Sequence, residues 1–145
     1  MTILIKSTLR KRRPAGSAIR ARLEKVLAAA SLGHVELSIL FVGDRAMRTL
    51  NRAYRGKDRT TDVLSFSFRE GAFASLQAHV LGDIVISMPT AVRQARAAGE
   101  PLQREIDRLL IHGLLHLLGY EHERGGARER AMQSEGRRLL RVLHP

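Results

Sequence analysis

Three of the six histidines in this 145-residue chain lie within the twelve-residue stretch IHGLLHLLGYEH at positions 111–122. His112 and His116 are four residues apart. On a helix this spacing places both side chains on one face, about 40° apart around the axis and about 6 Å apart along it. Gly119 is the residue type that commonly ends a helix in the left-handed conformation, and the turn can bring His122 back toward the pair. The spacing predicts a metal site with three histidine ligands.

Such a site would leave one coordination position for water or substrate, whereas structural zinc usually takes four protein ligands. The alternative is that these are ordinary core histidines. However, the segment is apolar nearly all round, so imidazoles without partners there would carry a desolvation cost. Its apolar residues are Ile106, Leu109, Leu110, Ile111, Leu114, Leu115, Leu117 and Leu118. We therefore predict an open, catalytic metal site. Three imidazoles suit zinc, nickel or copper.

The spacing HxxxHxxGxxH is that of the metzincin proteases, which carry a glutamate directly after the first histidine as the general base. In this chain that position is Gly113, so the usual protease base is missing. A histidine-bound divalent ion can still activate water and polarise a phosphoryl oxygen, and such hydrolysis needs no nucleophilic side chain. The glycine therefore favours phosphodiester over peptide hydrolysis.

With that glycine, HGLLHLLGYEH resembles the HGxLHLxGYxH signature of the YbeY family, metal-dependent endoribonucleases also known as rRNA maturation factors. Residues 54–66 resemble the YRGKDxxTxVLSF block of that family, and residues 81–86 resemble its LGDIxI strand. The resemblance runs from about residue 37 to residue 143. The sequence departs from the pattern at Ser67, where the family usually has proline, and its tail stops soon after the last helix.

The resemblance implies a zincin-like fold and a single-strand-specific endoribonuclease that acts in small-subunit rRNA maturation and ribosome quality control. It implies one divalent ion on His112, His116 and His122, with Zn²⁺ expected and Ni²⁺ as the alternative. The implied partners are rRNA and the ribosome, with a small-subunit ribosomal protein and a ribosome-associated GTPase.

Arg55 matches the arginine of the YRGKD block and is the predicted catalytic residue. Phosphodiester cleavage develops negative charge on the phosphate oxygens, which an arginine can stabilise. Lys57 and Arg59 would then position phosphates. The alternative for Arg55 is a loop arginine in a surface ion pair with Asp58.

Two carboxylates, Asp83 and Glu121, lie close in sequence to the motif strand and the ligands. Either could orient a ligand imidazole through its second nitrogen, or each could be a turn or solvent residue. The remaining histidines lie outside any ligand pattern and are assigned no role: His34, His79 and His144.

The chain carries 25 lysine and arginine residues against 14 acidic ones, a net charge of +11. Guanidinium groups suit phosphate, which favours a polyanionic partner, although a solvated arginine-rich surface would give the same count. Cysteine is absent, which excludes disulfides, thiolate zinc sites and a cysteine nucleophile. No apolar run approaches the roughly 18 residues of a membrane span, and the N-terminus does not resemble a signal peptide. We expect a cytoplasmic protein without membrane contact.

Alternating apolar residues predict strands at 35–42, 63–68 and 81–87, and weakly at 2–7. Helical spacing predicts helices from Ser17 to about residue 30, from a cap at Asp44 to about residue 54, and at 89–98, 102–118 and 127–143. Residues 69–79 are expected to form a loop near the site. The length suits one domain over residues 1–145. Strands and helices without a regular βαβ period indicate an α+β fold, with one small mixed sheet, about five helices, and a buried central metal-binding helix.

Three functions compete at this point. The first is the endoribonuclease that the resemblance implies. The second is a metallopeptidase, which the histidine spacing favours and Gly113 opposes. The third is a non-catalytic RNA-binding or ribosome assembly factor in which the metal only holds the fold. A peptidase should cleave denatured protein without RNA, whereas an assembly factor should bind rRNA and cut nothing.

Overall fold

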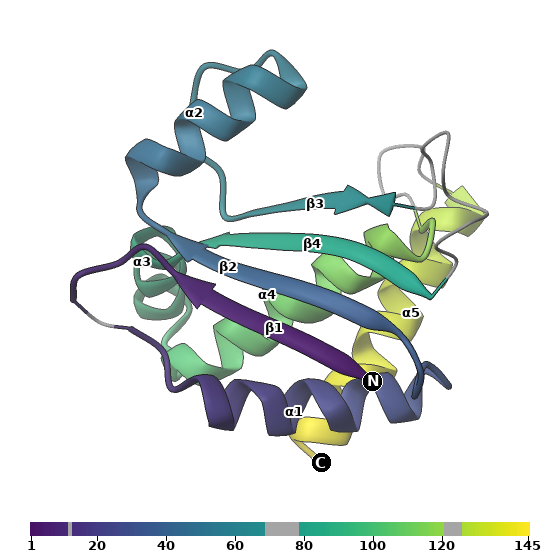
Figure 1. Ribbon diagram of the computed structural model, residues 1–145. Helices are drawn as coiled ribbons and strands as arrows, with labels where there is room; N and C mark the ends of the chain where they lie inside the picture. The colour runs from purple at the N-terminus through teal and green to yellow at the C-terminus, as the bar shows by residue number, and fades with distance from the viewer. Residues whose placement is uncertain (12, 69–78, 121–125) are drawn as a thin grey trace.

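A mixed four-stranded sheet organises the computed structural model, which describes residues 1–11, 13–68, 79–120 and 126–145 (Figure 1). The strands lie in the order β1 (Thr2–Ser7), β2 (Glu36–Val42), β4 (Val80–Ser87) and β3 (Val63–Ser67). β1, β2 and β4 run parallel, and the edge strand β3 pairs antiparallel with β4. The predicted α+β class is confirmed, as is the weakly predicted strand at the N-terminus.

Five helices accompany the sheet within the described residues: α1 (Gly16–Ala29), α2 (Asp44–Arg55), α3 (Met88–Ala98), α4 (Leu102–Leu117) and α5 (Gly126–Leu143). α4 crosses behind the sheet and packs against α3, α5 and β3, while α2 contacts β4 and α3 (Figure 1). No helix in the parts of the chain that the structure describes is long and apolar enough to cross a bilayer.

Two predicted helix caps are wrong. Ala15, not Ser17, occupies the position before α1, and Gly43, not Asp44, occupies the position before α2; neither makes a side-chain cap. Asp44 instead accepts hydrogen bonds of 2.6 Å each from the hydroxyls of Ser87 and Thr90. Its carboxylate therefore ties the start of α2 to the end of β4 and to α3, a long-range contact that local capping rules do not anticipate.

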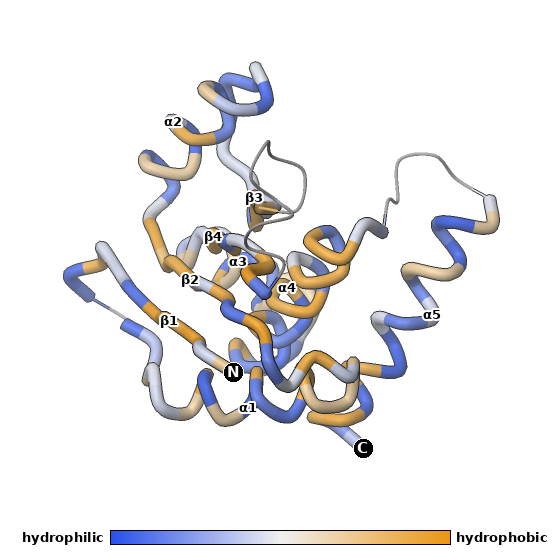
Figure 2. Tube along the Cα trace, turned by 45° about the vertical axis from the view of Figure 1, so that its right-hand side comes forward, coloured by the Kyte–Doolittle hydropathy of each residue, from blue (hydrophilic) through white to orange (hydrophobic). Residues whose placement is uncertain are grey.

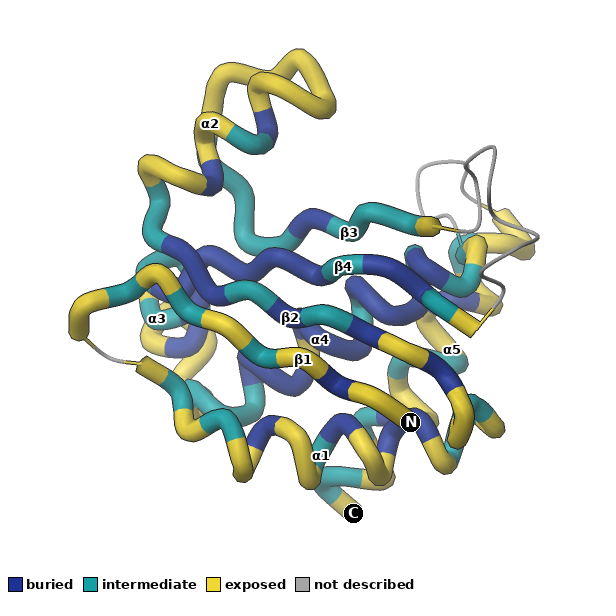
Figure 3. The backbone as a smooth tube through the Cα atoms, in the orientation of Figure 1, coloured by how far each residue is buried: buried dark blue, intermediate teal, exposed yellow. Residues whose placement is uncertain are grey.

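The apolar core lies between the sheet and the helices behind it, and α4 is its centre. Figure 2 shows hydrophobic residues gathered along α4 and the strands, and Figure 3 shows most of α4 buried. The buried residues of α4 include Leu109, Leu110, Ile111, Leu114, Leu115 and Leu117. The prediction of a buried central helix is confirmed. The front face of the sheet is more open, and exposed residues appear along β1 and β2 (Figure 3).

A buried carboxylate also fastens α4 to both ends of the chain. The Asp107 residue is 1% exposed. Its Oδ1 accepts from Arg22 Nε at 2.9 Å and from Gln103 Nε2 at 2.9 Å, and its Oδ2 lies 2.7 Å from Nε2 of His144. Burial alone would raise the pKa of this carboxyl, but the hydrogen bonds from Arg22, His144 and Gln103 outweigh it and hold the pKa below its ordinary value. His144, to which the sequence assigned no role, is thus a structural partner.

We expect Asp107→Asn to lower the free energy of unfolding by about 2 kcal/mol at neutral pH, because it removes charge-assisted hydrogen bonds from a buried site. A carboxyl with a lowered pKa stabilises the fold above its ordinary value of 3.8 and loses that contribution as the pH falls through its folded pKa. In urea denaturation, the deficit of the variant should therefore shrink below about pH 4. Asp58→Asn, at a 52% exposed carboxylate, is the control and should change stability little; equal effects of the two substitutions would contradict this account.

Candidate metal centre

His112 and His116 lie one turn apart on α4 with their ring nitrogens converging. The two Nε2 atoms are 3.0 Å apart, and the ring centroids are 4.6 Å apart at 73°. Two nitrogens bound to one tetrahedral zinc at about 2.0 to 2.1 Å would be separated by about 3.3 Å. The observed pair is therefore close to the arrangement that a shared ion needs, and the predicted placement of both rings on one helix face is confirmed.

The surroundings of α4 explain why this face is accessible. Most of the helix is buried in the core, whereas both histidines are only half-buried. They lie near the edge strand β3, whose Ser65 hydroxyl donates a hydrogen bond of 2.9 Å to the Gly113 carbonyl. Sequence reasoning did not single out Ser65. The alternation along β3 was the available signal, since it places Ser65 on the opposite face from Leu64 and Phe66.

Gly113 sits where α4 approaches the sheet too closely for a side chain. A Cβ at this position would lie 2.8 Å from Ile84 Cγ2 and 3.2 Å from Ser65 Oγ. A side chain at position 113 would thus point toward β4 and β3. A glutamate here would have to displace the side chains of Ile84 and Ser65 before it could act as a base, which is a physical reason for the glycine and weighs against a peptidase.

The helix ends as predicted at Gly119, whose φ is +95°. The amide of Gly119 donates to the His116 carbonyl at 3.0 Å and the amide of Tyr120 donates to the Leu115 carbonyl at 3.0 Å, which is the Schellman pattern. The chain therefore reverses directly after the histidine turn. His122 and Glu121 lie outside the described residues, so the third ligand stays a prediction.

Asp83 does not fit the role of orienting a ligand imidazole. Its neighbours Gly82 and Ile84 face α4, since a Cβ on Gly82 would lie 3.1 Å from Leu117 Cδ2 and Ile84 abuts Gly113. Alternation along β4 sends Asp83 to the opposite face, where it lines a groove with Ser38 and Lys6. This hypothesis is wrong because the strand period puts the carboxylate on the far side of the sheet from the histidines.

Arg55 is the last residue of α2, not a loop residue as predicted, and it is exposed. The alternative prediction for Arg55 was a surface ion pair with Asp58. In the structure Asp58 lies 2.9 Å from Arg48 Nε and 3.9 Å from Arg52 Nη1. These ion pairs join the Asp58 loop to earlier turns of α2. The catalytic role of Arg55 stays a prediction.

The basic loop after α2 is held in a defined conformation. Gly56 ends the helix with a left-handed φ of +68°. The buried Asn51 side chain donates to the Arg59 carbonyl at 2.8 Å. Lys57 and Arg59 are both exposed on this loop. The backbone is therefore fixed while the cationic side chains reach solvent, as phosphate-positioning residues would need.

A short path connects this end of α2 to the histidine turn. Tyr54 packs edge-on against Phe66 of β3, with ring centroids 4.9 Å apart at 68°. Phe66 follows Ser65, which bonds to Gly113 between the two histidines. Within the described residues, the edge strand β3 therefore lies between the C-terminal end of α2 and the histidine turn.

This chain is similar to known proteins over most of its length. A family model described as Endoribonuclease YbeY matches residues 6–144. The chain is 42% identical over 145 residues to the Endoribonuclease YbeY of Syntrophus aciditrophicus, covering 99% of this chain and 91% of that protein. It is 46% identical over 128 residues to the Endoribonuclease YbeY of Aquifex aeolicus, covering 88% and 82%. The solution structure of a Thermotoga maritima protein aligns with a TM-score of 0.66 and 25% identity over 97% of this chain and 88% of that one.

Proposed function

We propose that this chain, a member of the endoribonuclease YbeY family and therefore a nuclease acting on RNA, is a metal-dependent hydrolase that cleaves single-stranded RNA. In this proposal it acts during small-subunit rRNA maturation and ribosome quality control. The observation that carries metal dependence is the 3.0 Å approach of the Nε2 atoms of His112 and His116. The chain has no cysteine, so a thiolate site or a cysteine nucleophile is not available.

In this proposal His112 and His116 hold one divalent ion, with His122 as the third ligand. Zn²⁺ is the expected ion, and Ni²⁺ is the alternative that three imidazoles also suit. When bound, such an ion lowers the pKa of water toward neutrality and polarises a phosphoryl oxygen. The Ser65 and Gly113 contact would keep the histidine turn fixed against β3.

The remaining chemistry falls to cations near the end of α2. Arg55 would stabilise the negative charge that develops on the phosphate oxygens during cleavage. Lys57 and Arg59, on the loop fixed by Asn51, would hold neighbouring phosphates. Their charges would then fix the register of the RNA without reading its sequence.

The proposed partners are rRNA, a small-subunit ribosomal protein and a ribosome-associated GTPase, and the proposed location is the cytoplasm. The net charge of +11 supports a polyanionic partner. The experiment that tests the substrate class compares cleavage of single-stranded RNA, double-stranded RNA and denatured protein by one preparation. Cleavage of single-stranded RNA alone is expected. Cleavage of protein would favour the peptidase, and rRNA binding without cleavage would favour an assembly factor.

We expect RNA binding to weaken steeply with salt, because arginine contacts to phosphate release counterions. If four phosphates of a single strand are contacted, raising monovalent salt from about 50 to about 200 mM should weaken affinity about fiftyfold. Fluorescence anisotropy of a labelled oligonucleotide measures this dependence, with a neutral-backbone oligonucleotide of the same sequence as the control. An affinity for RNA that is unchanged over this range would exclude the basic surface as the binding face.

A further inference from the structure

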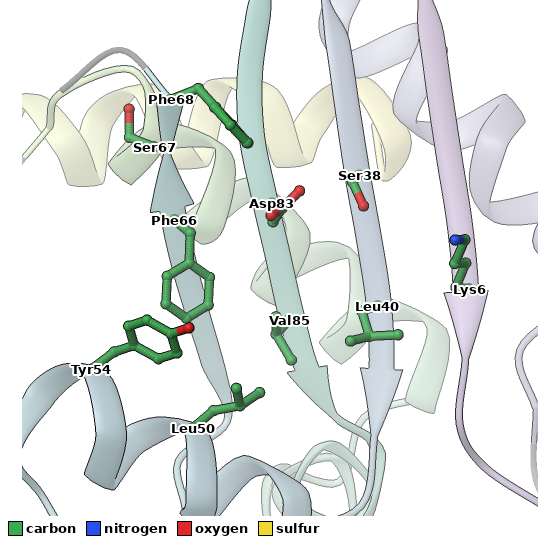
Figure 4. Close-up of a pocket in the computed structure, with 10 residues that line it drawn as sticks. All are labelled: Lys6, Ser38, Leu40, Leu50, Tyr54, Phe66, Ser67, Phe68, Asp83 and Val85. Carbon is green, nitrogen blue, oxygen red and sulfur yellow. The ribbon is translucent and has the colours of Figure 1, made fainter. Parts of the chain in front are cut away.

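The open face of the sheet carries a groove on the side away from the histidines. Its volume is about 460 Å³, within the range of about 300 to 1,000 Å³ typical of small-ligand pockets. Tyr54 from α2 and Phe66 from β3 form one wall, Lys6 on β1 lies at the opposite side, and Asp83 and Ser38 lie between them (Figure 4). Neither the proposed metal nor Arg55 accounts for this groove.

Aromatic rings are unusually prominent at the groove. Tyr54 is 68% exposed and Phe68 is 47% exposed, although the whole chain is only 4% aromatic. Tyr54 is not a loose surface ring, because the edge contact with Phe66 holds it in place. A fixed and exposed ring at the rim of a pocket is a ready surface on which a flat group can stack.

The charges around the groove fit a nucleic acid strand. α2 contributes Leu50 and Tyr54 to the lining of the groove, and its four arginines lie outside that lining. Lys6 adds a cation on the opposite side. The floor differs, because Asp83 is a carboxylate that would repel a phosphate and can only accept hydrogen bonds when ionised. Lys6 can thus contact a phosphate at one side of the groove, and a group with N–H donors is favoured beside Asp83.

We propose that this groove binds unpaired nucleobases of the RNA substrate, one stacked on Tyr54 and another on Phe68, with a base N–H donated to Asp83. The inference rests on the proposed function and adds the site that holds the strand. Because the edge strand β3 is the described element between the groove and the histidine turn, one RNA strand passing over this sheet edge can place a base in the groove and a nearby phosphate at the histidines. A duplex keeps its bases paired and stacked, so the groove also accounts for single-strand preference.

The test uses the full-length, metal-loaded protein and short RNA oligonucleotides that carry one 2-aminopurine, whose fluorescence falls when the base stacks on an aromatic ring. Stopped-flow records binding before turnover. We expect quenching with the wild-type protein, and weaker binding by about tenfold to one hundredfold in Tyr54→Ala, the range expected from losing one stacked base. Tyr54→Phe should bind within about twofold of wild type because it keeps the ring. Val142→Ala, at an exposed residue of α5 outside the groove, is the control.

A second comparison separates base binding from phosphate binding. An oligonucleotide with abasic sites in place of its bases should bind at least about tenfold more weakly than the complete one. If Tyr54→Ala does not fold, the RNA affinity of Phe68→Ala and the 2-aminopurine quenching by the wild-type protein test the inference in its place.

Equal affinity for abasic RNA, unquenched 2-aminopurine, or wild-type affinity in folded Tyr54→Ala would each overturn the inference. A groove for a protein partner predicts these same three results, so they would favour that occupant. Cleavage with groove-independent binding would leave the proposed function standing without the inference. Groove-dependent binding without any cleavage would support base binding in the groove and contradict the proposed cleavage of RNA.

Discussion

His116→Ala should lose the bound metal and reduce RNA cleavage by more than about one thousandfold, a larger loss than the tenfold to one hundredfold typical of removing a residue that only supports a metal ligand. His116 supplies one of the two converging nitrogens, and His112 alone cannot chelate an ion from this helix. Metal binding is linked to folding, so the variant should also melt at a lower temperature than the metal-loaded parent. Elemental analysis and single-turnover cleavage on one preparation measure both losses.

The matched control is His79→Ala, at a histidine just before β4 whose side chain is 53% exposed and faces Glu36 at the start of β2. This variant should keep its metal and its cleavage rate. If His116→Ala retained a full equivalent of metal, His116 would not be a ligand of that metal. If it also retained its cleavage rate, the histidine pair would not be the catalytic site.

Arg55→Ala should reduce cleavage by about one hundredfold to one thousandfold, the loss typical of removing one preorganised electrostatic partner of a transition state. Because Arg55 is exposed at the end of α2, its removal should leave metal content and melting temperature nearly unchanged. Arg55→Lys should restore only part of the rate, because a point charge cannot reproduce the bidentate guanidinium fork. Single-turnover rates at saturating RNA isolate this effect from binding.

Arg141→Ala, at an exposed arginine in the last turn of α5, removes the same charge away from the site and is the control for the loss of net charge. If Arg55 were only structural, Arg55→Ala would lose a little stability and retain cleavage. If the protein were an assembly factor, Arg55→Ala would bind rRNA more weakly with no cleavage to lose. Full activity in Arg55→Ala would remove this residue from the mechanism.

The sequence was sufficient for most of the fold because local patterns and tertiary packing agree along this chain. The apolar run from Ile106 to Leu118 predicted the buried helix, and Gly119 predicted where it ends, since only a left-handed residue allows the observed reversal. The caps were predicted less well. Asp44 has the right residue type for a cap, but its carboxylate is taken by Ser87 and Thr90, which lie far away in the sequence.

The site shows the same division between local and long-range information. The placement of His112 and His116 follows from helical spacing alone. The strand period could have excluded Asp83 as a partner of these histidines, but only once β4 was known to have α4 on one face. The groove and the cluster around Asp107 bring together residues from β1 to the C-terminus. No window of sequence contains them, and sequence reasoning found neither.

The most direct test of the central claim is RNA cleavage by the purified protein before chelation, after removal of its metal, and after return of one equivalent of Zn²⁺. Metal content is measured at each stage on the same sample, with Ni²⁺ in a parallel arm. We expect cleavage of single-stranded RNA to disappear with the metal and to return with it in the wild-type protein, and not to return in His116→Ala. Cleavage that persists at an unchanged rate in protein shown to be metal-free would contradict a metal-dependent endoribonuclease centred on His112 and His116.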